Sequence, residues 1–397
     1  MKNDRTFLEK LLDGTEVEWK PLDEVANIAN NARKPVKSSL RVSGNIPYYG
    51  ANNIQDYVEG YTHDGEFVLI AEDGSASLEN YSIQWAVGKF WANNHVHVVN
   101  GKEGLNNRFL YHYLTSMNFI PFLTGKERAK LTKAKLQQIP IPIPPLSVQT
   151  EIVKILDALT ALTSELTSEL TSELTLRRKQ YEYYLDNLLS KEELGKIGFE
   201  WKCLKDICDY VDFRGKTPKK TESGIFLVTA KNIKKGFIDY NASKEFVSES
   251  DYIEIMRRGL PRIGDVLITT EAPCGNVAQI DKEDIALAQR VIKYRSSNEN
   301  ILDNTFLKFM LLSKEFQVNL IKLSTGGTVK GIKGSTLHKM KIKIPPIDEQ
   351  KRIVSILEKF EILTNSITEG LPLAIEQSQK RYEYYRELLL SFNGSNQ

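Results

Sequence analysis

Leucine recurs at every fourth position through the middle of the chain, within residues 159–184, where the tetrapeptide TSEL occurs three times in succession from Thr163 to Leu174. A period of four fits an α-helix, in which residues i and i+4 lie one above the other, and does not fit a strand, whose side chains alternate every two residues. The pattern predicts a helix with one apolar stripe that turns slowly around it, because four residues exceed one helical turn. The stripe consists of Leu162, Leu166, Leu170 and Leu174.

This helix requires a burial partner. Threonine and serine are mediocre helix formers, and the glutamates of the repeat place like charges at i,i+4, which is mildly destabilising. Burial of the apolar stripe against another element must therefore supply most of the stability.

An internal repeat with an offset of 201 residues indicates the burial partner of this helix. IPIPPLSVQTEIVKIL at 141–156 returns as IKIPPIDEQKRIVSIL at 342–357, and KQYEYYLDNLLS at 179–190 returns as KRYEYYRELLLS at 380–391. The repeat predicts a second helix of matched length, packed antiparallel to the first because one leads away from the first block and the other leads back. The positions aligned with the leucine stripe are Leu363, Ile367, Leu371 and Ile375.

Prolines precede both predicted helices, and another lies inside the second. Pro145 and Pro346 precede them, where proline ends extended structure and opens a helix. Gly370 and Pro372 fall inside the second helix and predict a kink or break there.

The blocks between the helices also resemble each other. EWKPL at 18–22 matches EWKCL at 200–204, and similar pairs follow at 65–70 with 264–268 and at 109–116 with 306–313. Turn signals and short apolar runs predict strands, and longer periodic runs predict helices. The expected strands are 67–71, 95–99, 224–229, 265–270 and 285–294, and the expected helices are 106–117 and 304–314.

These observations predict an α+β protein with two similar globular domains separated by two long antiparallel helices. The arrangement is pseudo-two-fold and circular, because FLEKLL at 7–12 resembles the end of each helix repeat. The expected divisions are a first domain at 1–145, a central spacer helix at 146–195, a second domain at 196–346 and a distal spacer helix at 347–397.

Composition narrows the class of protein. A chain of 397 residues with 41% hydrophobic and 26% charged residues is typical of globular proteins, and no apolar run approaches the ~20 residues of a membrane span. The three cysteines indicate a reducing compartment, so we expect a cytoplasmic protein without membrane association. Residues 196–350 carry 26 basic and 20 acidic side chains, an excess that hints at an anionic partner.

Signatures of catalysis are incomplete. Gly215-Lys216-Thr217 resembles the end of a phosphate-binding P-loop, but Tyr210 stands where that motif has its first glycine. The five histidines lack metal-ligand spacing, and His95 and His97 are expected on one strand face in structural roles. The remaining acid–base candidates, which follow equivalent strands, are Glu72, Asp73 and Glu271. We therefore expect a chain that catalyses no reaction alone and holds no metal or cofactor.

Features suited to nucleic acid occur at corresponding places in both blocks. Basic loops at 125–135, 214–220 and 326–333 suit phosphate contacts, and amide or guanidinium side chains suit base edges. The candidate DNA-binding residues are Arg33, Lys34, Asn52, Asn53, Asn93, Asn94, Lys126, Arg128, Lys130, Lys133, Arg214, Lys216, Lys219, Lys220, Lys231, Asn232, Gln289, Arg290, Lys330 and Lys333.

The layout resembles the specificity (S) subunit of type I restriction-modification enzymes across nearly the whole chain. TSEL repeats followed by RRKQYEYYLDNLLS look like the central spacer of that family, and the two IPP-containing segments look like its paired helix starts. FRGKTPKKTESGIFLVTAKNIKKG and RIGDVLITTEAPCGNVAQI look like segments of its target-recognition domains. The distal helix lacks the tetrapeptide, so only the first helix carries a countable repeat.

The resemblance implies a non-catalytic subunit that reads a bipartite double-stranded DNA site, one half with each domain, across a gap set by the paired helices. It also implies two modification subunits that methylate adenine with S-adenosylmethionine, and restriction subunits that translocate and cleave DNA with ATP and magnesium. Two other readings of the residues stay open, an antiparallel-helix scaffold with two protein-binding heads and an enzyme with unrecognised catalytic residues.

Overall fold

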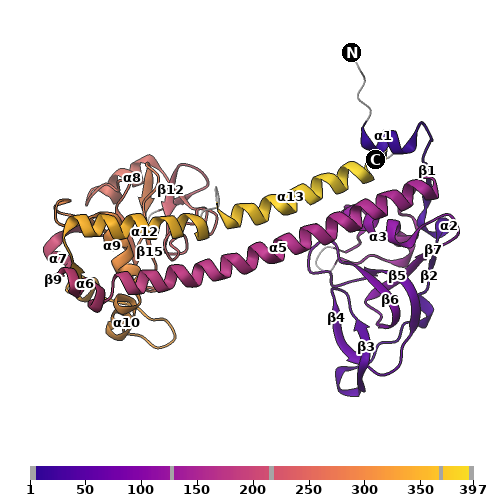
Figure 1. Ribbon diagram of the computed structural model, residues 1–397, viewed down its shortest axis with the longest axis horizontal. Coiled ribbons are helices and arrows are strands. Elements are labelled where there is room, and N and C mark those ends of the chain that lie inside the picture. Colours follow the sequence, from indigo (N-terminus) through magenta and orange to yellow (C-terminus); the bar gives the residue numbers. More distant parts are fainter. Residues whose placement is uncertain (1–5, 126–128, 214–218, 366–369, 393–397) are drawn as a thin grey trace, which may run out of the picture. The chain divides into compact units, whose positions relative to one another are not determined.

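The computed structural model describes residues 6–125, 129–213, 219–365 and 370–392. The chain divides into two compact units, the first made of Met1–Ser168 with Glu376–Gln397 and the second of Glu169–Ile375. Both divisions fall inside helices, α5 (Leu146–Leu188) and α13 (Leu371–Leu390), so each unit contains a globular domain with parts of the spacer helices (Figure 1).

The spacer helices begin directly after the prolines that the sequence singles out. α5 is continuous over 43 residues. The distal helix is broken into α12 (Ile347–Asn365) and α13, as Gly370 and Pro372 predict. Gly370 has a φ of 86°, and a Cβ atom there would lie 2.7 Å from the carbonyl oxygen of Ile362, so only glycine fits at this break.

The first globular domain contains one six-stranded sheet in the order β2-β7-β5-β6-β3-β4 and a two-stranded sheet, β1-β8. Its elements are α1 (Phe7–Leu12), β1 (Glu18–Pro21), α2 (Leu22–Val25), β2 (Ala26–Ile28), η1 (Asn30–Ala32), η2 (Ser38–Leu40), β3 (Ser43–Tyr49), β4 (Ile54–Val58), β5 (His63–Ala71), β6 (Ile83–Ala92), β7 (Val96–Gly101), α3 (Asn107–Ser116), η3 (Ile120–Phe122), α4 (Lys133–Gln137) and β8 (Pro140–Ile143).

The second globular domain contains two four-stranded sheets, β10-β17-β14-β15 and β11-β13-β12-β16, and a two-stranded sheet, β18-β9. Its elements are α6 (Lys191–Ile197), β9 (Glu200–Cys203), α7 (Leu204–Ile207), β10 (Cys208–Asp212), β11 (Lys220–Thr221), β12 (Ile225–Val228), β13 (Phe246–Val247), α8 (Glu249–Met256), β14 (Val266–Thr269), β15 (Val277–Gln279), β16 (Ile285–Leu287), β17 (Val291–Ser296), α9 (Asn304–Leu312), α10 (Lys314–Leu323), α11 (Gly334–Leu337) and β18 (Lys341–Ile344).

The two domains share a framework around one central strand. The order β2-β7-β5-β6 in the first corresponds to β10-β17-β14-β15 in the second, and β1-β8 corresponds to β9-β18. Residues 68–71 of β5 and all of β14 are buried on both faces, which explains their continuous apolar runs. Val68 and Ile70 pack into one core of the first domain, Leu69 into another, and the second domain repeats this division with Val266, Ile268 and Leu267.

Beyond the framework the domains differ. The first extends its sheet with β3 and β4, whereas the second adds the separate sheet β11-β13-β12-β16 and helix α8. The predicted strand at 285–294 was wrong in extent, because residues 288–290 interrupt it. β16 belongs to the added sheet and β17 to the framework, so one apolar run serves two sheets.

The spacer helices pair antiparallel inside each unit. In the first unit the Thr160 hydroxyl lies 3.1 Å from the Tyr382 hydroxyl, and Leu389 and Leu390 join the core that holds Ile152. In the second unit Tyr184 stacks on Phe360 with ring centroids 5.2 Å apart, and Leu185 and Leu189 share a core with Leu357 and Ile353. Within each unit, residues further along α5 therefore contact residues earlier in the partner helix, as antiparallel packing requires.

The buried seam of α5 only partly follows the predicted leucine stripe. Leu174 is buried and Leu170 half-buried, but Leu162 is 63% exposed and Leu166 36% exposed, which corrects the packing prediction for these two. The reason is the turn of the helix, since each four-residue step advances about 40° beyond a full turn. Half-buried Thr163 and Thr167 replace them. Leu363, Leu371 and Ile375 are half-buried, and Ile367 lies outside the described residues.

A fully buried glutamine in the first turn of each long helix joins it to its globular domain. The Gln149 Oε1 accepts a hydrogen bond from the Asn106 backbone N–H at 2.8 Å, and its Nε2 donates to the carbonyls of Gly104 and Pro144 at 2.9 and 2.8 Å. The Gln350 side chain makes the same three contacts, at 2.9, 2.8 and 2.8 Å, to the residues Asp303, Ile301 and Pro345. Asn106 and Asp303 cap α3 and α9, so each glutamine fixes a helix start inside the domain.

A polar contact reinforces this joint in the first unit. Asp157 of α5 accepts hydrogen bonds from Arg108 and His112 of α3, both at 2.8 Å. Burial alone would raise the pKa of Asp157, but these two donors hold it below its usual range. Burial lowers the pKa of His112, although its hydrogen bond to Asp157 opposes the shift.

We predict that Gln149→Ala and Gln350→Ala each lower the free energy of unfolding of their own unit. The loss should be about 1–3 kcal/mol for each buried polar group left without a partner. Hydrogen exchange of the α3 and α9 amides separates the two units. Gln379→Ala, at an exposed position of α13, should change stability by less than about 0.5 kcal/mol. Equal effects of the buried and exposed substitutions would contradict the role of the joint.

We predict that acidification destabilises the first unit partly through His112. Its lowered pKa means that the unfolded chain binds the proton more readily, so the stabilising contribution is present above an ordinary histidine pKa of about 6.5 and is lost as the pH falls toward the folded pKa. Denaturant midpoints at pH 7.5 and 5.5 should therefore differ less for His112→Gln than for the unmodified chain. An identical pH dependence in both would rule out this contribution.

Candidate nucleic-acid interface

In the first domain the basic loop predicted at 125–135 lies against the end of β5. The Leu131 N–H donates to the Glu72 carbonyl at 2.8 Å, and Thr124 and Lys130 exchange two backbone hydrogen bonds of 2.9 Å. The loop is therefore attached at the edge where β5 leaves the sheet. Its residues 126–128, which include Lys126 and Arg128, lie outside the described residues.

The second domain builds the same arrangement. The Ile332 N–H donates to the Thr270 carbonyl at 2.9 Å, and Thr325 and Gly331 exchange backbone hydrogen bonds of 2.8 and 2.9 Å. Both basic loops therefore occupy one place on the shared framework. Their exposed lysines are Lys133, Lys330 and Lys333, and Lys130 is 45% exposed.

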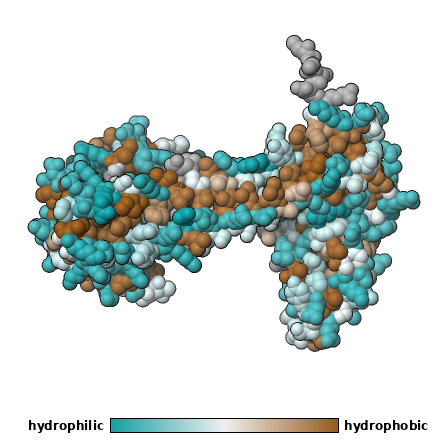
Figure 2. Space-filling model, in the orientation of Figure 1, coloured by the Kyte–Doolittle hydropathy of each residue, from teal (hydrophilic) through white to brown (hydrophobic). Residues whose placement is uncertain are grey.

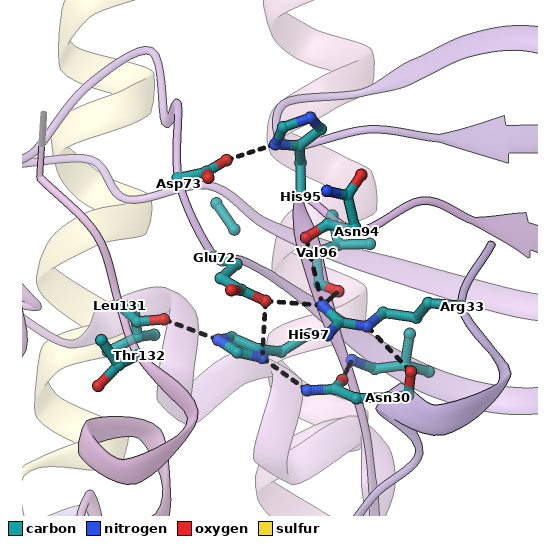
Figure 3. A network of polar contacts seen from close by, with 12 residues as sticks. Asn30, Arg33, Glu72, Asp73, Asn94, His95, Val96, His97, Leu131 and Thr132 are labelled. Atoms are coloured by element: carbon teal, nitrogen blue, oxygen red, sulfur yellow. Dashed lines mark hydrogen bonds and ion pairs between the residues drawn. The ribbon is translucent and has the colours of Figure 1, made fainter. Parts of the chain in front are cut away.

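A polar network fastens the loop of the first domain to the sheet (Figure 3). The Glu72 carboxylate receives the Arg33 Nη1 at 2.7 Å and the Lys130 Nζ at 2.9 Å, and Arg33 also donates to the Val96 carbonyl at 2.7 Å. Burial alone would raise the pKa of Glu72, but the two cations bring it below its ordinary value. The cost of burying these charges is offset because each is paired.

His97 completes this network. Its Nε2 lies 2.8 Å from the Leu131 carbonyl and its Nδ1 lies 2.9 Å from the Asn30 side chain, so the fully buried ring bridges the basic loop to η1 (Figure 3). Burial lowers the pKa of His97, which keeps the ring neutral. The structural role predicted for His97 fits these contacts. His95 differs, because it precedes β7 and its side chain is 49% exposed.

Four predicted DNA-binding residues use polar groups in contacts within their own domain, although Asn52 is exposed, and their role at DNA stays a prediction. Arg33 donates a hydrogen bond to the Glu72 carboxylate. The Asn52 side chain donates to the Gly74 carbonyl and accepts from the Ala76 N–H. Asn93 is buried and accepts from the His95 N–H. Asn232 is completely buried, and its amide closes its own turn through Thr229, Asp239 and Ser243. The sequence missed this because turn-closing amides and base-reading amides are the same residue types.

The other described candidates keep surface positions. Lys220 contacts Glu245 at 2.9 Å, Arg290 contacts Glu271 at 3.2 Å, and Gln289 is half-buried with partners of its own. Arg214 and Lys216 lie outside the described residues. The remaining exposed candidates are Lys34, Asn53, Asn94, Lys219 and Lys231.

Two exposed acid–base pairs, which the candidate set did not recognise as pairs, stand beside the basic loops. His95 Nδ1 lies 2.5 Å from Asp73 Oδ1 in the first domain, and Arg290 Nε lies 3.2 Å from Glu271 Oε2 in the second. The sequence hinted at them by placing Asp73 and Glu271 after equivalent strands, but their partners lie just before the neighbouring strands β7 and β17.

A metal site and a membrane span are both missing from the residues that the structure describes. In the described part of the chain, no group of three or more histidine, cysteine, aspartate or glutamate side chains converges in the way a metal site requires. Among the described helices, none combines the length and the apolar character needed to cross a bilayer.

Comparison with known proteins gives consistent matches. A family model described as the type I restriction modification DNA specificity domain matches residues 15–176 and 196–377. A putative type I restriction enzyme specificity subunit of Haemophilus influenzae is 62% identical and aligns over 99% of this chain and 100% of its own length. The EcoR124I/EcoR124II specificity subunit of Escherichia coli is 33% identical over 98% of each chain.

Solved structures give the same fold. The HsdS subunit of Thermoanaerobacter tengcongensis superposes with a TM-score of 0.50 at 17% identity, over 96% of this chain and 97% of its own. A chain from a study of complex assembly and conformational transition of the type I R-M system superposes with a TM-score of 0.60 at 17% identity, over 95% and 98%. With two matched regions on the duplicated framework and a relative at 62% identity over its full length, the chain belongs to the family of type I restriction-modification DNA specificity subunits.

Proposed function

We propose that this chain reads a bipartite DNA target, one half with each globular domain, and catalyses no reaction itself. The observation that carries the proposal is the shared framework with different additions, β3 and β4 in one domain and the sheet β11-β13-β12-β16 with α8 in the other. One docking geometry with two different reading surfaces suits two half-sites of different sequence. The curated relatives are named as specificity subunits, which supports a recognition role.

Exposed lysines supply the contacts to phosphate in this proposal. Lys133 and Lys333 stand at the start of short helices that follow the basic loops, and Lys330 lies within its loop. Phosphate contacts position a protein on the duplex without reading sequence, so base discrimination comes from other side chains.

The helices set the gap between the half-sites. One tetrapeptide adds about 6 Å and about 40° of rotation to a helix. A base-pair step adds ~3.4 Å and, at ~10–10.5 pairs per turn, about 35°. The rotations nearly agree, so one tetrapeptide turns a reading domain by about the angle of one base pair.

Two equal surface features on the spacer helices suit two copies of one partner. Tyr183 is 63% exposed and Tyr384 61% exposed, and each lies edge-on to the following tyrosine at 5.5 and 5.4 Å. Apolar side chains lie open along the spacer helices (Figure 2). We assign these positions to two modification subunits. The adenine-methylating activity with S-adenosylmethionine, and the ATP- and magnesium-dependent activity of restriction subunits, belong to the partner chains in this proposal.

The test is to express the chain with a modification subunit and to map methylated adenines across the genome. The expected result is one bipartite motif with a fixed gap, absent when this chain is omitted. Methylation without a motif, or a motif that does not depend on the chain, would contradict the proposal. An electrophoretic shift of target duplex by the assembled complex distinguishes DNA reading from a purely protein-binding scaffold.

We predict that deleting one TSEL, residues 167–170, shortens the gap by about one base pair and leaves both half-sites unchanged, because only the rotation and length of α5 change. Methylome sequencing of the deletion strain measures both features. A change in which Ser164 and Ser168 become alanine keeps the length and should keep the gap. An unchanged gap after deletion would show that the repeat does not set it.

We predict that Tyr183→Ala and Tyr384→Ala each weaken the binding of one modification subunit, and that the double variant weakens both. Loss of an aromatic anchor at the centre of an interface can cost more than about 1 kcal/mol, which is about a fivefold or larger weakening of binding. Native mass spectrometry of the complex reports the stoichiometry. Tyr57→Ala, at a 52% exposed position in β4, is the matched control. Full two-copy binding by the double variant would exclude this surface.

A further inference from the structure

We propose that His95 with Asp73 and Arg290 with Glu271 are equivalent base-reading pairs, one in each domain, and that His95 and Arg290 determine the base accepted at corresponding positions of the two half-sites. The inference rests on the proposed DNA-reading function and names its reading residues.

Backbone hydrogen bonds establish the equivalence. β5 pairs with β7 up to Ala71 and Val96, and β14 pairs with β17 up to Thr269 and Val291. One more backbone hydrogen bond of 2.8 Å follows the last strand pair in each domain. It runs from the Glu72 N–H to the His95 carbonyl in the first domain and from the Thr270 N–H to the Arg290 carbonyl in the second. The carboxylate residue of each pair then follows on the same strand end.

Each pair directly follows buried residues of the sheet. The residues immediately inside it, Ala71 and Val96 in one domain and Thr269 and Val291 in the other, are completely buried. The side chains of the pairs are 37–55% exposed, so they reach solvent from a fixed backbone. A reading side chain needs this combination, because its position must be set before it meets a base edge.

The hydrogen-bonding capacity of His95 is set by its carboxylate. Asp73 contacts Nδ1, and a carboxylate only accepts hydrogen bonds, so Nδ1 carries the proton (Figure 3). When the ring is neutral, Nε2 is then an acceptor. In the major groove such an acceptor suits the amino group of adenine or cytosine.

Arg290 has the opposite preference. Glu271 Oε2 lies 3.2 Å from Nε of its guanidinium, a contact that does not use Nη1 or Nη2. Two parallel donors suit O6 and N7 of guanine. The backbone φ of 71° at Arg290 marks a turn that presents this side chain at the strand end.

The basic loops adjoin both pairs. An isolated antiparallel bridge links Asp73 to Lys130 in the first domain, and another links Glu271 to Gly331 in the second. A loop that contacts phosphate therefore lies beside a pair that can face bases, which is the usual division of labour at a DNA interface. The network around Glu72 does not recur in the second domain, because Thr270 takes the place of Glu72 there. The exposed acid–base pair occurs in both domains.

The test uses the complex with its modification subunits and a duplex library in which each half-site position carries all four base pairs. Arg290→Ala should lower discrimination at one base pair of one half-site by about tenfold or more, and His95→Ala should do so in the other half-site. Arg290→Lys keeps the charge but not the two-donor fork, so it should relax the same base pair while binding DNA with similar salt dependence.

Controls separate reading from folding. Arg352→Ala removes a guanidinium that is 54% exposed and bound through Nε to Glu349, and it should leave discrimination unchanged. Glu271→Ala should relax the base pair that Arg290→Ala relaxes, and Glu271→Asp should restore part of the discrimination, which a purely structural role would not do. Melting curves verify that each variant is folded, and Arg290→Lys decides the outcome if the alanine variant unfolds.

Three results would overturn the inference. They are unchanged discrimination in the folded Arg290 and His95 variants, equal weakening at every position, and relaxation of the same half-site by both. A wild-type complex without any sequence preference would instead overturn the proposed function itself.

Discussion

A single side-chain amide ties each globular domain to the long helix that leaves it. Gln149 and Gln350 are fully buried, and each satisfies one backbone N–H and two carbonyls of neighbouring segments. Leaving such groups unpaired is costly, so the domain and the first helical turn have one favourable arrangement. This constraint matters because a small angular error at the root of a helix of 43 residues grows over roughly 65 Å. The direction in which each long helix leaves its domain therefore depends on these joints.

The sequence predicted the architecture well where the repeat has a constant offset. The helix starts after Pro145 and Pro346, the break at Gly370 and the α+β class follow from local signals and from two copies that support each other. Inside the domains the constant offset fails, because different segments are inserted between equivalent strands. The strand predicted at 285–294 was split between two sheets for this reason, and the leucine stripe was misplaced because a period of four is not the period of the helix.

The contacts of the candidate residues within the fold could not be predicted from the sequence, and the cause is long-range pairing. Arg33 reaches Glu72 and Val96, 39 and 63 positions away, so composition cannot show that its charge is already used. Asn232 closes a local turn that looks the same in sequence as an exposed amide. The lysines described in the loops at 125–135 and 326–333 are largely exposed, as glycine and lysine together indicate, whereas the pairing of Asp73 with His95 depends on a strand register that the sequence does not display.

The break between α12 and α13 makes the two spacer helices unequal carriers of a repeat. α5 is one continuous helix of 43 residues, so an added tetrapeptide extends it by about 6 Å without interrupting it. α12 and α13 are separate helices, and Gly370, just before the second, has a backbone conformation that other residues rarely adopt. A tetrapeptide count can therefore be kept on α5 alone, which is where the sequence places it.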